Sequence, residues 1–304
     1  MMTQAGDRLR GALWGMFVGD ALCLGSHWHY DLEKRDREVY PGGMCGFDRP
    51  IAAHYHAGRE PGDPTHYGDG ALLLLQSVTE HRGFDAAACG KAWVEHFSSG
   101  YSGYLDKATR GVIELFPTTG RGGDDRQTGG MAKMAAIVAI TPEEELEATV
   151  ERAVRVFQDN DEAVALNLVF ALLLRALLDG RSVSEAIDGA GIPGTLMQAV
   201  EEALPLPVIE ATGRFGRACN LEQTFPSVLH AFLRDGHSFT TPMLETARAG
   251  GDNAARAAVL GALLGARHGL GAIPPLWIER LRERQRIAPL VEASGSLAAE
   301  RQLA

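Results

Sequence analysis

The chain has 304 residues, of which 45% are hydrophobic and 22% are charged, and it carries a net charge of −10. This composition is typical of a globular protein with a substantial core. The acidic balance argues against nucleic-acid and anionic-membrane partners, because binding to phosphates needs clustered lysine and arginine.

Targeting and membrane segments are not expected. The first ten residues lack the apolar stretch of a secretory signal, and the longest apolar run, 163–178, is interrupted by Asn167 and Arg175. This run is too short and too polar to span a bilayer and predicts a buried helix. The four cysteines are scattered without a CxxC pair, so we expect a reduced, cytoplasmic protein.

Apolar residues three or four positions apart dominate the chain and predict an all-α fold. The first helix is expected over 8–23, and a segment rich in glycine, histidine and tyrosine follows over 25–68. Further helices are predicted at 71–81, 86–97, 107–116, 131–140, 142–158, 163–178, 182–188, 194–203, 221–234, 242–249, 253–268 and 275–284. A glycine-rich loop at 117–130 is long enough to cover a site. No linker divides the chain, so we expect a single domain over 1–304, with a frayed tail at 295–304.

Two of these helices carry glycine at every fourth position. The glycines are Gly11, Gly15 and Gly19 in the first helix and Gly261, Gly265 and Gly269 in the last long helix. Each interior glycine costs up to about 1 kcal/mol relative to alanine, so the stripes need a packing reason. We expect them to face each other in antiparallel helices, with Gly11 near Gly269 and Gly19 near Gly261. His27 and His29 would then approach the start of the last long helix.

Asp20 returns to the apolar face of the first helix, where a carboxylate must be hydrogen-bonded, paired or metal-bound. The sequence leaves two interpretations open. Asp20 either satisfies loop amides in a structural role or belongs to a binding site.

Histidine and aromatic residues gather in two clusters, at 26–30 and at 54–69. Such side chains suit stacking on a base and hydrogen bonding to ribose. For any single residue, packing within an ordered loop is the more ordinary explanation, but the two clusters together favour a pocket. The spacing of His27 and His29 also suits a transition metal, although no cysteine or acidic residue lies at a diagnostic spacing.

Two Gly-Asp sequences precede or open helices, around Asp69 and Asp252. Each aspartate is either a helix N-cap or a carboxylate beside free helix-terminal amides, which suits Mg²⁺ together with phosphate or ribose.

Four segments together resemble the ADP-ribosylglycohydrolase family. They are GALWGMFVGDAL at 11–22, YGDGALLLL at 67–75, TGGMAKMAAI at 128–137 and GGDNAARAAVLGALLGARHGLGAIPPLW at 250–277. The SHWHYD and YGD variants are more similar to the J1-crystallin branch of the family. The resemblance implies an all-α, orthogonal multi-helix fold and a cleft for ADP-ribose. It also implies two Mg²⁺ ions that activate water while an N- or O-glycosidic bond is cut.

Most acidic residues of the family's metal-binding motifs are replaced in this chain. Asp69 alone remains of the first acidic triplet. Asp252 remains of the second motif, where Ala254 and Ala255 hold other ligand positions. His27 stands where many members have a glutamate. We therefore expect one Mg²⁺ at most, with Asp69 and Asp252 as its ligands.

The resemblance and the residues together predict a hydrolase that cleaves an ADP-ribosyl-like glycosidic bond, with its metal requirement reduced or lost. Asp69 or Asp252 would act as base, and His27 or His29 would supply protons. The substrate, a small molecule or a protein-attached ribosyl or nucleotide-like group, is expected to contact a further set of residues: Asp20, His29, Tyr67, Asn253 and Arg256.

A catalytically silent ADP-ribose-binding protein, a structural crystallin-like protein and a changed reaction at the His/Tyr clusters remain alternatives. The oligomeric state is open. The hydrolase interpretation requires the carboxyl groups of Asp69 and Asp252 to converge on one cavity. Arg256, one helical turn after Asp252, is expected to pair with it or with a substrate phosphate.

Overall fold

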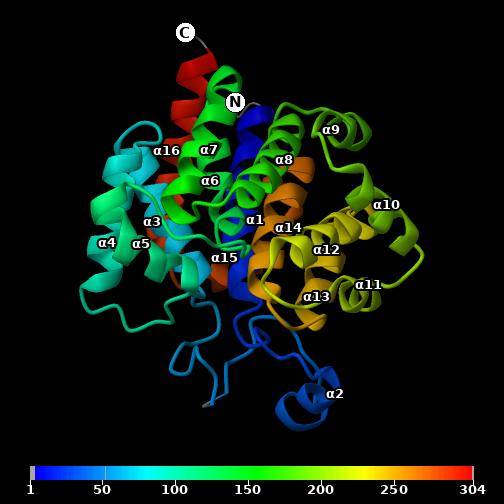
Figure 1. The fold of residues 1–304 in the computed structure, drawn as a ribbon. Helices are drawn as coiled ribbons and strands as arrows, with labels where there is room; N and C mark the ends of the chain where they lie inside the picture. The colour runs from blue at the N-terminus through cyan, green and yellow to red at the C-terminus, as the bar shows by residue number, and fades with distance from the viewer. Residues whose placement is uncertain (1–3, 52, 303–304) are drawn as a thin grey trace.

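Two antiparallel helices, α1 (Gln4–Leu22) and α14 (Asn253–His268), pack side by side through the middle of the molecule (Figure 1). The structure is a computed structural model that describes residues 4–51 and 53–302. A Cβ added to Gly15 would overlap the carbonyl group of Gly261, and one added to Gly11 would overlap Gly265 and Gly269. The predicted contact between the two glycine stripes is therefore confirmed.

The register of this contact differs from the prediction at one end. Gly19 faces Ala257 and not Gly261, which faces Gly15. The stripe on α14 continues one turn towards its N-terminus through an alanine, because alanine is also small enough for close backbone approach.

The other helices surround this pair (Figure 1). On one side lie α3 (His66–Glu80), α4 (Ala86–Ser98) and α5 (Lys107–Thr119), and on the other α8 (Asp161–Leu178) and α9 to α13. The bounds of the remaining helices are α2 Leu32–Lys34, α6 Ala135–Val138, α7 Leu146–Phe157, α9 Val183–Gly189, α10 Gly194–Ala203, α11 Val208–Phe215, α12 Leu221–Asp235, α13 Thr240–Arg248, α15 Pro275–Arg280 and α16 Arg284–Gln302.

The all-α prediction is confirmed, since the only β-pairing in the described part of the chain consists of isolated bridges. No helix among the described residues is both long enough and apolar enough to cross a membrane. One connected cluster of buried apolar side chains runs from Leu9 to Leu297. This continuity supports the single-domain prediction, which stays a prediction.

The helix α3 begins at His66, five residues before the predicted start. Its N-cap is Thr65, whose hydroxyl accepts a hydrogen bond from the N–H of Tyr67 at 3.1 Å. Asp69 therefore lies within the first turn of α3 and is not its N-cap. The helix α11 was not predicted at all.

The prediction of a frayed tail is wrong for residues 295–302. They form the end of α16, which packs against α1 and α3. Leu297 is buried, and the guanidinium of Arg301 donates to the carbonyl of Ile140 at 2.6 Å. Residues 303–304 lie outside the described residues.

The C-terminal end of α1 and the N-terminal ends of α3 and α14 meet at one end of the molecule. The irregular segment between α1 and α3 covers this end (Figure 1). The first cluster of histidine and aromatic residues belongs to it, and the second begins in it and ends in the first turn of α3.

Candidate functional site

The turn before α14 is held against the loop that follows α1. Trp28 donates its backbone N–H to the carbonyl of Gly251 at 2.7 Å, and Gly251 donates to the carbonyl of His29 at 2.8 Å. Gly250 and Gly251 have φ of 65° and 62°, in the left-handed region that favours glycine. The predicted approach of the His27–His29 segment to the start of α14 is confirmed.

Asp252 occupies the N-cap position of α14 but does not cap the helix with its side chain. Its Oδ2 accepts a hydrogen bond from the Tyr67 hydroxyl at 2.9 Å. Its Oδ1 is buried and has no hydrogen-bond partner of good geometry among the described residues. Burial raises the pKa of Asp252 to about 6, and Tyr67, Arg256 and the Trp28 indole offset part of this effect.

Asp252 lines a cavity of 340 Å³ whose walls are mainly aromatic. The rings of Trp28 and Tyr104 meet edge to face with centroids 4.7 Å apart, and those of Trp28 and Tyr55 do so at 5.1 Å. The lining residues are Trp28, Tyr30, Tyr55, His66, Tyr67, Tyr104, Asp106, Gln127, Cys219 and Asp252. Both aromatic clusters of the sequence thus contribute to one pocket.

A second cavity of 420 Å³ adjoins the first, because Tyr104 and Gln127 line both. Lys107 and Arg110 lie on its wall, and the Arg110 guanidinium is 6.0 Å from the centre of the Tyr104 ring. Nothing in the sequence marked Tyr104, Asp106, Gln127 or Cys219 as site residues, since they come from loops and helix starts without a recognisable motif. The predicted covering loop, 117–130, does reach the site through Gln127.

Asp69 is not among the residues that line the Asp252 cavity. Its Oδ2 accepts from the Tyr101 hydroxyl at 2.5 Å and pairs with the Arg59 guanidinium at 2.5 Å. The lining of this cavity includes Asp252 and not Asp69, so the structure does not support their predicted convergence on one cavity. The physical reason is that Arg59 neutralises Asp69 within a separate, partly buried network.

The sequence left two roles open for Asp20, and the structure supports the structural one. It is buried, and its two oxygens accept from the backbone N–H of Thr65, at 2.7 Å, and from the Thr65 hydroxyl. Asp20 thereby fixes the residue that caps α3. Both its oxygens are occupied, which leaves the predicted substrate contact without support.

Asn253 and Arg256 brace the turn around Asp252 from within the protein. The Asn253 amide donates to the Ser26 hydroxyl at 2.7 Å and to the Ala247 carbonyl at 2.8 Å. The Arg256 guanidinium donates to the carbonyl of Gly250 and lies only 1% exposed. Its predicted ion pair with Asp252 is not formed, because the guanidinium is directed to backbone carbonyls.

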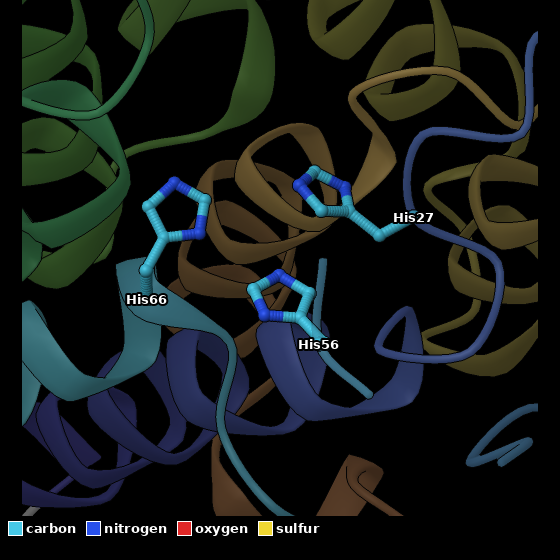
Figure 2. A group of neighbouring side chains, drawn as sticks. All are labelled: His27, His56 and His66. Carbon is cyan, nitrogen blue, oxygen red and sulfur yellow. The ribbon is translucent and has the colours of Figure 1, made fainter. Parts of the chain in front are cut away.

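His27, His56 and His66 face one another beside the cavity (Figure 2). One ring nitrogen from each lies within 4.8 Å of the others, and all three residues are buried. Burial and the neighbouring imidazoles hold the pKa of His27 well below its usual value. A neutral His27 is a poor source of protons, so its surroundings do not support the acid role predicted for it.

His29 lies outside this trio. Its ring stacks on that of His54 with centroids 5.7 Å apart, and burial lowers its pKa to about 4. It is not among the cavity-lining residues.

The side chains do not fit the two Mg²⁺ ions that the resemblance implies. Mg²⁺ needs several hard oxygen ligands around one point. Asp69 is committed to Arg59, and alanines follow Asp252 at the other ligand positions. Of the predicted ligands, Asp252 alone keeps a free buried carboxylate oxygen.

Comparisons with known proteins agree on the class. A solved structure described as an ADP-ribosylglycohydrolase-related protein complex matches with a TM-score of 0.75 at 28% identity, over 98% of this chain and 100% of that one. Crystallin J1A of Tripedalia cystophora is 27% identical over 95% of this chain and 96% of its own length. An ADP-ribosylarginine hydrolase of Pseudomonas putida (strain GB-1) is 26% identical over 95% of this chain and 78% of its own length.

The fold and the aromatic cavity thus define an all-helical protein of glycohydrolase type. The sequence model of the ADP-ribosylglycohydrolase family matches residues 1–304, and the chain belongs to this family. Membership supports a glycoside hydrolase, while the crystallin relatives are compatible with the silent or structural alternatives.

Proposed function

We propose that this protein hydrolyses an ADP-ribosyl-like glycosidic bond, with Asp252 as the general base. The observation that carries the proposal is the free Oδ1 of a buried carboxylate at the wall of an aromatic cavity. A buried acid with a raised pKa at a cavity is a common feature of catalytic sites.

The proposed reaction uses groups that already surround Asp252. A water molecule on Oδ1 gives its proton to the carboxylate as its oxygen attacks the anomeric carbon, and the glycosidic C–N or C–O bond breaks. The Tyr67 hydroxyl holds Oδ2, which keeps Oδ1 directed at the water. The leaving group departs with a proton from solvent.

The two adjoining cavities suit the parts of a nucleotide-like ligand. Rings of Trp28, Tyr55 and Tyr104 provide faces and edges for a base or a ribose. Lys107 and Arg110 in the second cavity match the charge of a diphosphate. The substrate is proposed to be a small-molecule or protein-attached ribosyl conjugate.

We further propose that the reaction does not depend on Mg²⁺. Asp69 is held by Arg59, and Asp106, the other carboxylate that lines the cavity, accepts from the N–H of Thr109 and lies beside His66. All four cysteines are free, which fits the proposed cytoplasmic location.

The test is release of ADP-ribose from ADP-ribosylated arginine by the full-length protein, without added Mg²⁺. We expect turnover by the wild type and a loss of about 10²–10⁴-fold in kcat for Asp252→Asn, the range for removal of a general base. Asp188→Asn, an exposed acid on α9, serves as the matched control and should retain full activity.

A catalytically silent binding protein is the second candidate, favoured by the crystallin relatives. It would show a rise in the melting temperature with ADP-ribose but no product. Turnover that Asp252→Asn leaves unchanged would instead remove Asp252 from the mechanism.

A further inference from the structure

We propose that His27, His56 and His66 form a binding site for a divalent transition-metal ion of the zinc type. The site is different in position and chemistry from the carboxylate site expected for Mg²⁺. Imidazole nitrogen is a good ligand for Zn²⁺, Co²⁺ and Ni²⁺, whereas Mg²⁺ prefers oxygen. The inference stands independently of the proposed hydrolase activity.

The three histidines come from separate parts of the chain and converge on one point. His27 follows α1, His56 lies in the loop before α3, and His66 is the first residue of α3. Figure 2 shows a ring nitrogen of each directed into the space that the three share. Their side chains are almost fully buried, with exposures of 0%, 2% and 6%.

Five of the six ring nitrogens have no hydrogen-bond partner among the described residues. They are Nε2 of His27 and both nitrogens of His56 and of His66. A buried polar atom without a partner costs about 1–3 kcal/mol, so such a concentration in one place needs a compensating ligand. A metal ion would satisfy one nitrogen from each ring.

The spacing is close to that of a metal site. Zinc binds imidazole nitrogen at about 2.0–2.1 Å, which places three such ligands about 3.3 Å apart. The three nitrogens here lie within 4.8 Å of one another. Shifts of at most about 0.9 Å for each nitrogen bring them to zinc distance.

One of the two tautomers of His27 suits a metal ligand and has a hydrogen-bond partner in place. The side-chain amide nitrogen of Asn253 donates to Ser26 and Ala247. The Asn253 Oδ1 is therefore the atom that faces His27 Nδ1, at 3.3 Å. With the proton on Nδ1, the ring donates to this oxygen and the lone pair of Nε2 is directed into the cluster. In the opposite tautomer Nδ1 accepts from the N–H of Ala254, at 3.4 Å, so a metal ion at Nε2 would select the tautomer that pairs with Asn253.

The other two histidines have neighbours that place them without occupying their ring nitrogens. The Asp106 carboxylate lies 3.8 Å from His66 Nε2 and is itself fixed by the N–H of Thr109. At zinc sites the ring nitrogen that does not bind the metal commonly faces a carboxylate in this way. The His56 backbone N–H donates to His54 Nδ1, and His54 Nε2 binds the carbonyl of His27 at 2.5 Å, so His54 joins the two ligand loops.

One residue with a strained backbone lies at the same place. Trp28 adopts φ of 60°, which is unusual for a residue with a side chain and costs on the order of 1–3 kcal/mol. Its indole stacks on His56 at 5.1 Å and on His66 at 5.4 Å. The strain places an aromatic wall over two of the ligands.

Three protein ligands leave one position of a tetrahedral zinc ion for water or another small ligand. His66 lines both the cluster and the aromatic cavity, so a bound ion would lie next to that cavity.

The experiment is isothermal titration calorimetry of the untagged, chelator-treated full-length protein with Zn²⁺ and with millimolar Mg²⁺. We expect one equivalent of Zn²⁺ to bind and Mg²⁺ neither to bind there nor to compete. His56→Gln should lower the Zn²⁺ affinity at least about 100-fold, and Asn253→Ala about 10–100-fold. His237→Gln, which changes an exposed histidine, is the control and should bind Zn²⁺ as the wild type does.

Co²⁺ provides a readout that needs no variant, because a tetrahedral Co²⁺ centre gives intense visible absorption bands. We expect these bands in the wild type and their loss on addition of Zn²⁺. Absence of Zn²⁺ binding by the wild type would overturn the proposal. So would a folded His56→Gln protein that binds Zn²⁺ with unchanged affinity.

Discussion

Asp69 and Asp252 have similar sequence neighbourhoods but opposite surroundings. Each follows a glycine at or near the start of a long helix. Asp69 forms an ion pair with Arg59 and accepts a hydrogen bond from the Tyr101 hydroxyl. Asp252 meets the Tyr67 hydroxyl and the Trp28 indole at the cavity wall, and its Oδ1 keeps no hydrogen-bond partner of good geometry among the described residues. The neighbours of a carboxylate, and not its motif, decide whether it is available for chemistry.

The raised pKa of Asp252 predicts how activity depends on pH. A general base works when it is deprotonated, so a pKa of about 6 means that kcat/KM should rise from pH 5 to pH 7 and then level off. The groups that act on this carboxyl are Tyr67, Arg256, Trp28 and the more distant Asp106. The measurement is the pH–rate profile with ADP-ribosylated arginine as substrate.

Tyr67→Phe is the companion variant for this profile. Without the hydroxyl that stabilises the carboxylate, the midpoint should move to higher pH. A profile that falls across the range from pH 5 to pH 7 would contradict the role of Asp252 as a base.

At the scale of elements, the pairing of α1 with α14 positions the site. Glycine-to-backbone contacts bring the two helices close, and the loops at their site-facing ends pair through Trp28, His29 and Gly251. Without this close approach, the loop with His27 would not reach the start of α14.

Gly15→Ala tests this contact. The added methyl group would overlap the backbone carbonyl of Gly261, which cannot move away as a flexible side chain would. We expect the free energy of unfolding to fall by about 2 kcal/mol or more, since the clash outweighs the gain in helix propensity. Urea denaturation monitored by circular dichroism measures the change.

Gly194→Ala is the matched control, because an added Cβ at the start of α10 meets no atom within 4 Å. Its unfolding free energy should stay within about 1 kcal/mol of the wild type, with any change in the stabilising direction. Equal effects of the two substitutions would mean that the close contact contributes nothing specific.

At the scale of the whole molecule, the last helix returns to the first. The helix α16 packs on α1 and α3, and Arg10 near the start of the chain pairs with Glu292 at 2.6 Å. Leu297, on the same helix, is buried. The C-terminal segment that local sequence suggested would fray is therefore part of the core.

Leu297→Ala should lower the free energy of unfolding by about 2–4 kcal/mol, as is usual for truncation of a buried leucine. Leu276→Ala changes a leucine that is 55% exposed and should have an effect below about 0.5 kcal/mol. Thermal or urea unfolding of the two variants measures these changes. If the end of α16 were frayed, the two substitutions would have similarly small effects.

The sequence by itself determined the helical class, most helix positions, the antiparallel glycine stripes and the family. These features depend on local periodicity and on short motifs, and both are set by residues that lie close together along the chain. It also indicated that the histidine and aromatic clusters form a pocket, and it identified Asp252 correctly as a cavity residue.

Only the tertiary structure decided which polar groups were paired and which were free. Arg59 reaches Asp69 across a loop, Thr65 takes up both oxygens of Asp20, and His56 meets His27 from another segment. These contacts depend on how loops pack in three dimensions, and a buried charge or imidazole takes its character from whichever neighbour that packing supplies.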